Sequence, residues 1–75
     1  MTRSTITLHL KRPGERRDVA CPAQGLATWL LRGMRDAESG LFEILPAEPK
    51  ARLAYYQGKA LRRAGWTVNR PVVLH

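Results

Sequence analysis

The segment 48–66 constrains the fold most, because it predicts an amphipathic helix whose two ends are both marked. Pro49 suits a first helical turn, where a missing N–H costs nothing, and Gly65 lies where a residue with positive φ would stop the helix. At the helical period the segment divides into two faces. One face is expected to pack, and it carries Leu53, Tyr56, Ala60 and Ala64. The other is expected to be exposed to solvent, and it carries Arg52, Tyr55, Lys59, Arg62 and Arg63.

A β-hairpin is predicted at the start of the chain. Residues 3–11 alternate between apolar and polar side chains, which is typical of a half-buried strand. The turn at 12–15 has a proline to fix φ and a glycine that accepts positive φ, the pattern of a type II turn, and residues 16–21 fit the return strand. If the turn closes tightly, Val19 lies opposite Leu8, although a bulge could shift this register.

Three further segments complete the expected fold. Apolar residues at helical spacing predict a helix over 22–38. The short apolar run 41–45 predicts a strand, and residues 66–74 are rich in β-forming residues around a proline. The hairpin is therefore followed by α-β-α-β, which gives an α+β fold in the order ββαβαβ with two helices packed on a small, mainly antiparallel sheet. Without an internal repeat or a linker, residues 1–75 form a single domain.

The core of such a domain is expected to be thin. A chain of 75 residues buries only about 60% of the surface that it exposes when unfolded. Its single cysteine, Cys21, excludes an internal disulfide, so a compact core, a partner chain, or both must supply the stability. Surplus apolar side chains such as Trp29, Trp66 or Tyr56 favour a homodimer. The expected core residues each lie on the apolar side of their own segment, and they are Leu8, Leu10, Val19, Leu30, Met34, Phe42, Ile44, Leu53, Ala60 and Val68.

The charge of the chain points to an anionic partner. Its formal net charge is +7, which favours nucleic acid, an acidic protein or an anionic surface. No apolar stretch approaches the roughly 20 residues of a transmembrane helix, and no apolar signal-peptide region is present near the N-terminus, so a cytoplasmic location is expected.

The basic residues concentrate in two places. One is the exposed face of the helix within 48–66, and the other is the hairpin tip, which carries Lys11, Arg12, Arg16 and Arg17. If both lie on one side of the molecule, they form a cleft that follows a phosphate backbone. Tyr55 lies between Arg52 and Lys59, where it could stack on an unpaired base or simply lie over its own helix.

The side chains that could support catalysis or bind a metal are few. His9, Cys21 and His75 are the only conventional nitrogen and sulfur metal ligands, and their spacing fits no zinc motif. The tight hairpin register places His9 opposite Asp18, as a general-base pair or, in the simpler interpretation, a polar pair on the solvated face. No nucleophile or glycine-rich phosphate loop accompanies them, so no enzyme, metal or cofactor is expected.

The run 60–68, in which a helix passes through a glycine into a strand, resembles the junction between recognition helix and wing in winged helix-turn-helix domains. A winged helix has three helices before its wing, whereas here a hairpin occupies that position. No DNA-reading residue is therefore assigned from the resemblance.

Two functional hypotheses follow. The leading one is a small, non-enzymatic, basic binding module that contacts nucleic acid or a nucleoprotein through the helix face and the hairpin tip. The alternative is a protein-interaction inhibitor or adaptor, of the kind encoded by phages and mobile elements, whose basic face meets an acidic partner. A structural homo-oligomer is compatible with both.

Overall fold

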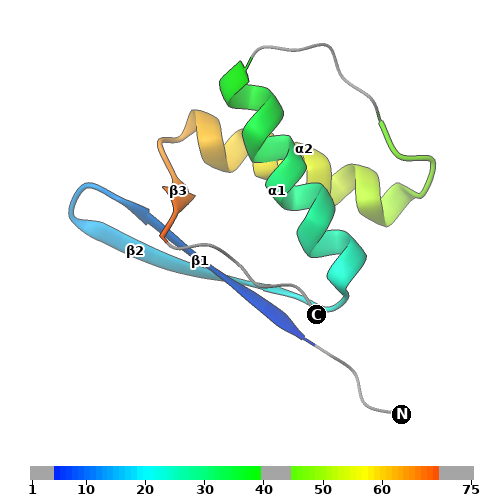
Figure 1. Ribbon diagram of the computed structural model, residues 1–75, viewed down its shortest axis with the longest axis horizontal. Helices are drawn as coiled ribbons and strands as arrows, with labels where there is room; N and C mark the ends of the chain where they lie inside the picture. Colours follow the sequence, from blue (N-terminus) through cyan, green and yellow to red (C-terminus); the bar gives the residue numbers. More distant parts are fainter. Residues whose placement is uncertain (1–4, 40–44, 70–75) are drawn as a thin grey trace.

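The computed structural model describes residues 5–39 and 45–69 (Figure 1). They form the strands β1 (Ile6–Arg12) and β2 (Glu15–Cys21), the helices α1 (Gln24–Ser39) and α2 (Pro49–Arg63), and the short strand β3 (Thr67–Val68). The sheet is antiparallel with the order β2-β1-β3, and both helices lie on one side of it (Figure 1). The predicted α+β fold is thereby confirmed. None of the described helices is long and apolar enough to cross a membrane.

The predicted hairpin is present, and it has the tight register of the two that the sequence left open. Leu8 pairs with Val19, and the pairing continues without a bulge to Arg12 opposite Glu15. Gly14 at the turn has a φ of 77°, the left-handed value that glycine accepts without strain. β1 and β2 therefore each direct alternate side chains toward the helices and toward the uncovered face of the sheet.

Helix α2 begins and ends where the sequence predicted. Pro49 is its first residue, and Gly65 follows it with a φ of 95°. The N–H of Gly65 donates to the carbonyl of Arg62, and the N–H of Trp66 donates to the carbonyl of Leu61, each at 3.0 Å. These two bonds are those of a Schellman motif, which satisfies the last carbonyls of the helix and turns the chain into β3. β3 then pairs with β1 and completes the sheet.

The two helices cross with their backbones in contact. A Cβ atom placed on Gly33 would lie 2.0 Å from the carbonyl oxygen of Tyr55, and one on Gly58 would lie 2.0 Å from that of Leu30. Each glycine thus receives the backbone of the other helix. This reciprocal contact is only available to residues without a side chain, and it sets which face of α2 turns inward.

The inward face of α2 is not the one that the sequence predicted. Tyr55 is fully buried and Lys59 is 6% exposed, whereas Leu53 is 71% exposed. Half of the inward residues are alanine or glycine, and the full set is Ala51, Ala54, Tyr55, Gly58, Lys59 and Leu61. Counting apolar residues favoured the face with Leu53, but a leucine at the crossing would hold the helices apart. The predicted packed face was therefore wrong, and the predicted exposed face was wrong for Tyr55 and Lys59, whereas Arg52 and Arg63 are exposed as predicted.

The core lies between the sheet and the helices. The predicted burial of Leu8, Leu10, Leu30 and Met34 is confirmed, and Val19 and Val68 are partly buried against them. The predicted burial of Leu53 and Ala60 is wrong, since both are exposed. Trp66, expected to be surplus at the surface, is 5% exposed within the chain's own core. Parts of three predicted strands lie outside the described residues, namely 3–4, 41–44 with Phe42 and Ile44, and 70–74. Leu45, the last residue of the predicted strand 41–45, is in no strand.

Candidate functional site

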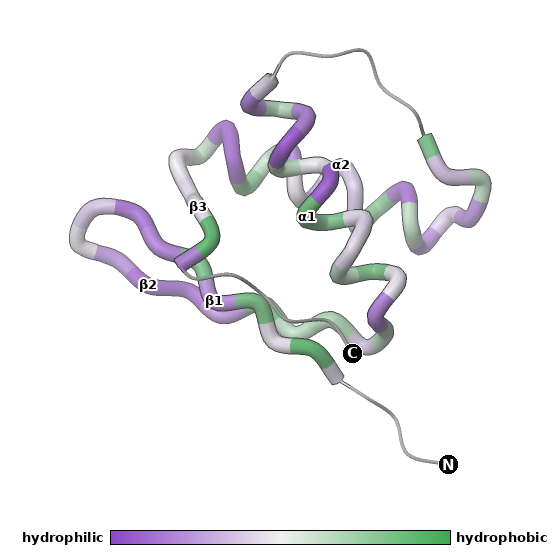
Figure 2. Tube along the Cα trace, in the orientation of Figure 1, coloured by the Kyte–Doolittle hydropathy of each residue, from purple (hydrophilic) through white to green (hydrophobic). Residues whose placement is uncertain are grey.

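The turn end of the hairpin gathers four of the predicted cations. Figure 2 shows that this end is hydrophilic, whereas the far end of the hairpin is hydrophobic. Lys11 lies directly opposite Arg16 on the uncovered face of the sheet, while Arg12 and Arg17 project on the side of the helices. We call these four residues the basic hairpin end.

Three of these cations, Lys11, Arg16 and Arg17, have no carboxylate partner among the described residues. The two acids of the hairpin are engaged elsewhere: Glu15 Oε2 accepts from Arg12 at 2.9 Å, and Asp18 Oδ1 lies 2.9 Å from His9 Nδ1. Like charges directly opposite each other across two strands are destabilising. The adjacent charges of Lys11 and Arg16 are therefore a local cost that an external anion would relieve.

Arg12 fastens the basic hairpin end to the end of α2. Its guanidinium lies 4.5 Å from the ring centroid of Trp66 and donates to the carbonyl of Ala64 at 3.0 Å. Arg17 lies over the same ring at 5.8 Å. Exposed Arg63 is next to Ala64 in the chain, so the predicted hairpin cations and one predicted helix cation belong to one end of the molecule.

The remaining predicted residues of the helix do not form one exposed stripe. Arg62 is half-buried, and its Nε lies 3.6 Å from Glu38 Oε2. Arg52 is exposed but at the other end of α2, where its Nε donates to the carbonyl of Pro46 at 2.8 Å. Lys59 and Tyr55 are buried, as described above. The prediction that all five side chains are available to a ligand is therefore wrong for these two buried residues.

Tyr55 has a structural role between the helices. Its hydroxyl donates to Asp36 Oδ2 at 2.7 Å, and the Asp36 residue is 8% exposed. Arg35 Nε lies 3.5 Å from the other oxygen of this carboxylate, and Lys59 Nζ lies 5.3 Å from the tyrosine ring. A ring held in this way cannot stack on a base, so the predicted stacking role of Tyr55 is corrected.

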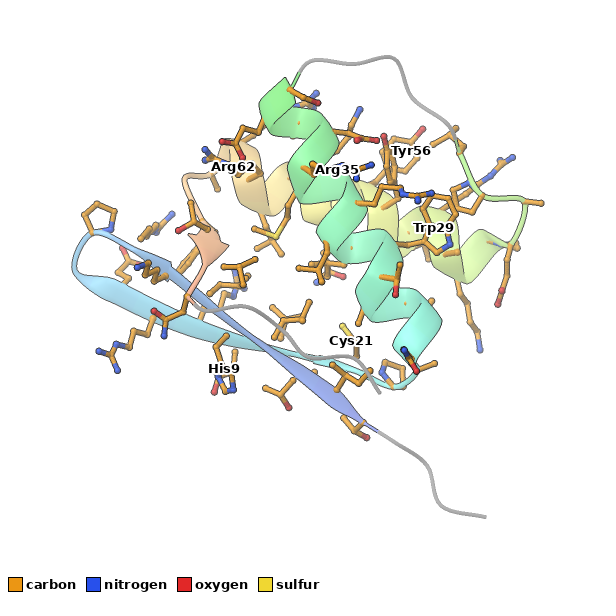
Figure 3. The ribbon with its side chains drawn as sticks, viewed as in Figure 1. His9, Cys21, Trp29, Arg35, Tyr56 and Arg62 are labelled. Atoms are coloured by element: carbon orange, nitrogen blue, oxygen red, sulfur yellow. The ribbon has the colours of Figure 1, made fainter. Side chains whose placement is uncertain are left out.

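The accessible aromatic side chains lie on either side of Tyr55. Trp29 is half-buried and Tyr56 is 46% exposed, and Figure 3 shows both, with Arg35, on the part of the molecule away from the hairpin turn. We define the aromatic–arginine face by its exposed or half-exposed residues, Trp29, Arg32, Arg35, Arg52 and Tyr56. This face was not predicted from the sequence, because Tyr56 was assigned to the packed face of its helix and Trp29 to a homodimer contact. Two helical spacings signal it: Trp29 to Arg32 at i,i+3 and Arg52 to Tyr56 at i,i+4.

A groove runs between strand β2 and helix α2. It is lined by Val19, Ala20, Gln57, Ala60 and Leu61 and opens to a volume of about 540 Å³. Leu53 continues the same apolar wall toward the start of α2. Among the described strands β2 lies at the edge of the sheet, so one side of its backbone faces away from β1. This is the face of α2 that the sequence predicted to be packed.

Among the described residues, the candidate chemical side chains do not converge on one site beyond a single pair. His9 and Asp18 form the predicted cross-strand pair, with side chains 41% and 66% exposed. Cys21 is buried at the other end of β2, and burial raises the pKa of its thiol. Within residues 5–39 and 45–69, no three His, Cys, Asp or Glu side chains come together as a metal site. His75 lies outside the described residues.

The chain was compared with known proteins once this geometry was defined. No protein-family model, curated protein or solved structure matches it.

Proposed function

We propose that this protein is a non-enzymatic nucleic-acid-binding module whose basic hairpin end contacts the phosphate backbone. One observation carries the proposal: the hairpin register places Lys11 and Arg16 side by side on an uncovered sheet face without a carboxylate partner among the described residues. The proposal retains the cytoplasmic location expected from the sequence.

The energetics support contact with a polyanion. Cations that bind phosphates release condensed counterions, and this release supplies most of the sequence-independent affinity for nucleic acid. Arg17, on the helix side of the sheet, and Arg63, in α2, are exposed at the same end of the molecule, so they add to the positive field around Lys11 and Arg16. A net charge of +7 adds long-range attraction to any such ligand. No base-reading side chain is implied, and binding is expected to be insensitive to sequence.

A salt series with matched lysine variants tests the proposal. The affinity of a generic duplex and of a generic single strand is measured against salt concentration for the wild type, Lys11→Gln and Lys50→Gln. Both lysines are exposed and lose the same charge, but Lys50 is in α2, far from the hairpin turn. Lys11→Gln should lower the log–log salt slope by about 1, and adding Arg16→Gln should lower it by about 2. Equal slopes for the Lys11 and Lys50 variants would refute the role of the basic hairpin end.

The groove beside β2 favours one alternative function, a protein-interaction module. An extended acidic segment of a partner could pair with the edge of β2, rest on the apolar wall and approach the cations Arg17 and Lys50 at its ends. In that case both nucleic-acid titrations would show no binding. Leu53→Glu, at a side chain that is 71% exposed, should then abolish binding of the isolated partner without lowering thermal stability.

A further inference from the structure

We infer that the aromatic–arginine face is a stacking site for unpaired bases, so that the nucleic-acid ligand is single-stranded. The inference rests on the proposed function for the class of ligand, but it uses different residues from the basic hairpin end.

A rigid, buried ring holds the accessible rings of this face in place. The Tyr55 ring centroid is 6.0 Å from that of Trp29, at an interplanar angle of 77°, and 5.9 Å from that of Tyr56, at 73°. Both contacts are edge-to-face, the geometry that aromatic pairs prefer. Tyr55 is itself fixed at its hydroxyl by Asp36 at 2.7 Å. The flanking rings therefore lose little conformational freedom when a ligand binds, which preserves affinity.

The charges around these rings suit a strand of nucleic acid. The Arg32 guanidinium lies 4.8 Å from the Trp29 ring centroid, and such planar groups stack on bases as aromatic rings do. Arg35 has a side chain that is 69% exposed, and Arg52 is exposed on the neighbouring helix. Asp36 lies beneath this face and pairs with Arg35 at 3.5 Å, so it offsets part of that charge, whereas Arg32 and Arg52 have no carboxylate partner among the described residues.

The composition of the face separates it from a simple phosphate site. Phosphates alone need cations, and the basic hairpin end provides them, while the one ring on the described part of the uncovered sheet face, that of His9, is paired with Asp18 at 2.9 Å. Base stacking needs an accessible ring, and Tyr56 provides one at 46% exposure. In a duplex the bases are already stacked on one another, whereas an unpaired base is free to stack on a side chain. The aromatic residues therefore favour single strands.

The test compares two ligands with equal numbers of phosphates. One is an oligothymidine of about 15 nucleotides, longer than the 38 Å molecule at about 3.4 Å per stacked nucleotide. The other is an abasic strand of the same length. Tyr56→Leu removes the ring and Tyr56→Phe keeps it, and thermal unfolding confirms that both variants fold. Stacking of one base predicts that Tyr56→Leu weakens oligothymidine binding about fivefold or more, that Tyr56→Phe has little effect, and that abasic binding responds to neither.

The outcomes separate this inference from the proposed function. If the abasic strand and a duplex bind as tightly as oligothymidine, and Tyr56→Leu changes nothing, the stacking site is refuted while backbone binding stands. If none of the three ligands binds the wild type, the proposed function fails and the stacking site fails with it. If oligothymidine is preferred but Tyr56→Leu has no effect, the bases are recognised elsewhere and the inference is again refuted.

Discussion

Replacing Gly58 by alanine should destabilise the protein, although alanine is the better helix former. A Cβ atom at Gly58 would lie 2.0 Å from the carbonyl oxygen of Leu30, 2.9 Å from its carbonyl carbon and 3.1 Å from the nitrogen of Met34. Ordinary contact begins at 3.4 Å, so the helices must separate by about 1.4 Å at the crossing. All three neighbours are backbone atoms, and no change of rotamer relieves the clash.

The magnitude follows from two opposing effects. Overpacking costs about 1–3 kcal/mol, and a backbone clash belongs at the upper end of this range. The alanine gains about 1 kcal/mol in helix propensity. The net loss is then about 2 kcal/mol, which for a domain of this size lowers the Tm by roughly 8–16 °C. Gly33→Ala should behave alike, because its Cβ would meet the carbonyl oxygen of Tyr55 at the same 2.0 Å.

Gly25→Ala is the matched control, since it lies in α1 but nothing is within 4 Å of its Cβ position. It should be neutral or stabilising by up to about 1 kcal/mol. Thermal and urea unfolding followed by circular dichroism measure all three variants. The double variant Gly33→Ala, Gly58→Ala should lose less unfolding free energy than the two single variants lose together, because one separation of the helices accommodates both methyl groups. A Tm for Gly58→Ala at or above that of the wild type would show that the backbones are not in contact.

Four further predictions concern stability and assembly. Leu30→Ala should lower the free energy of unfolding by about 2–5 kcal/mol in urea titrations, because the side chain is 1% exposed in the core; a loss below about 1 kcal/mol would contradict that packing. Tyr55→Phe should cost about 1.5–3 kcal/mol in the same assay, since the buried Asp36 carboxylate loses its 2.7 Å donor. Burial raises the pKa of the Cys21 thiol in the folded protein. As the pH rises, this thiol therefore ionises at a lower pH in the unfolded chain than in the folded protein. The free energy of unfolding should then decrease as the pH rises past the ordinary thiol pKa. The variant Cys21→Ala should not show this contribution to the decrease. Sedimentation at micromolar concentrations should show the homodimer expected from the thin core, whereas a single species of 8.5 kDa at all concentrations would exclude it.

The parts of the fold that local chemistry specifies were predictable. The proline and glycine placed the hairpin turn, and the structure has the tight one of the registers that the sequence left open, with His9 opposite Asp18. The ends of α2 followed from Pro49 and Gly65 because each acts on the backbone within one turn. These signals do not depend on what the rest of the chain does.

The orientation of α2 depended on a contact between helices and was missed. Because glycine has no side chain, Gly33 and Gly58 add nothing to the helical pattern of apolar residues, yet the contact between them turns the side with Tyr55 inward and leaves Leu53 exposed. The same rotation decided the candidate site. Lys59, predicted to be exposed, is buried, and Tyr56, predicted to be packed, is exposed. The cations of the hairpin do not depend on this rotation. A face of small residues at helical spacing is the signal for such close packing.

The edge position of β2 has a consequence for how the protein behaves at high concentration. A bare strand edge invites pairing between copies, and charged residues along it are a common safeguard against aggregation. The middle of β2 is charged, with Arg16, Arg17 and Asp18 in sequence. The positive charge that attracts an anionic ligand therefore also makes copies of the protein repel one another and keeps it in solution. A polyanion that neutralises these arginines removes this protection. The complex with a polyanion is therefore expected to be least soluble when its net charge is near zero. The free protein, which keeps its positive charge, is expected to be more soluble.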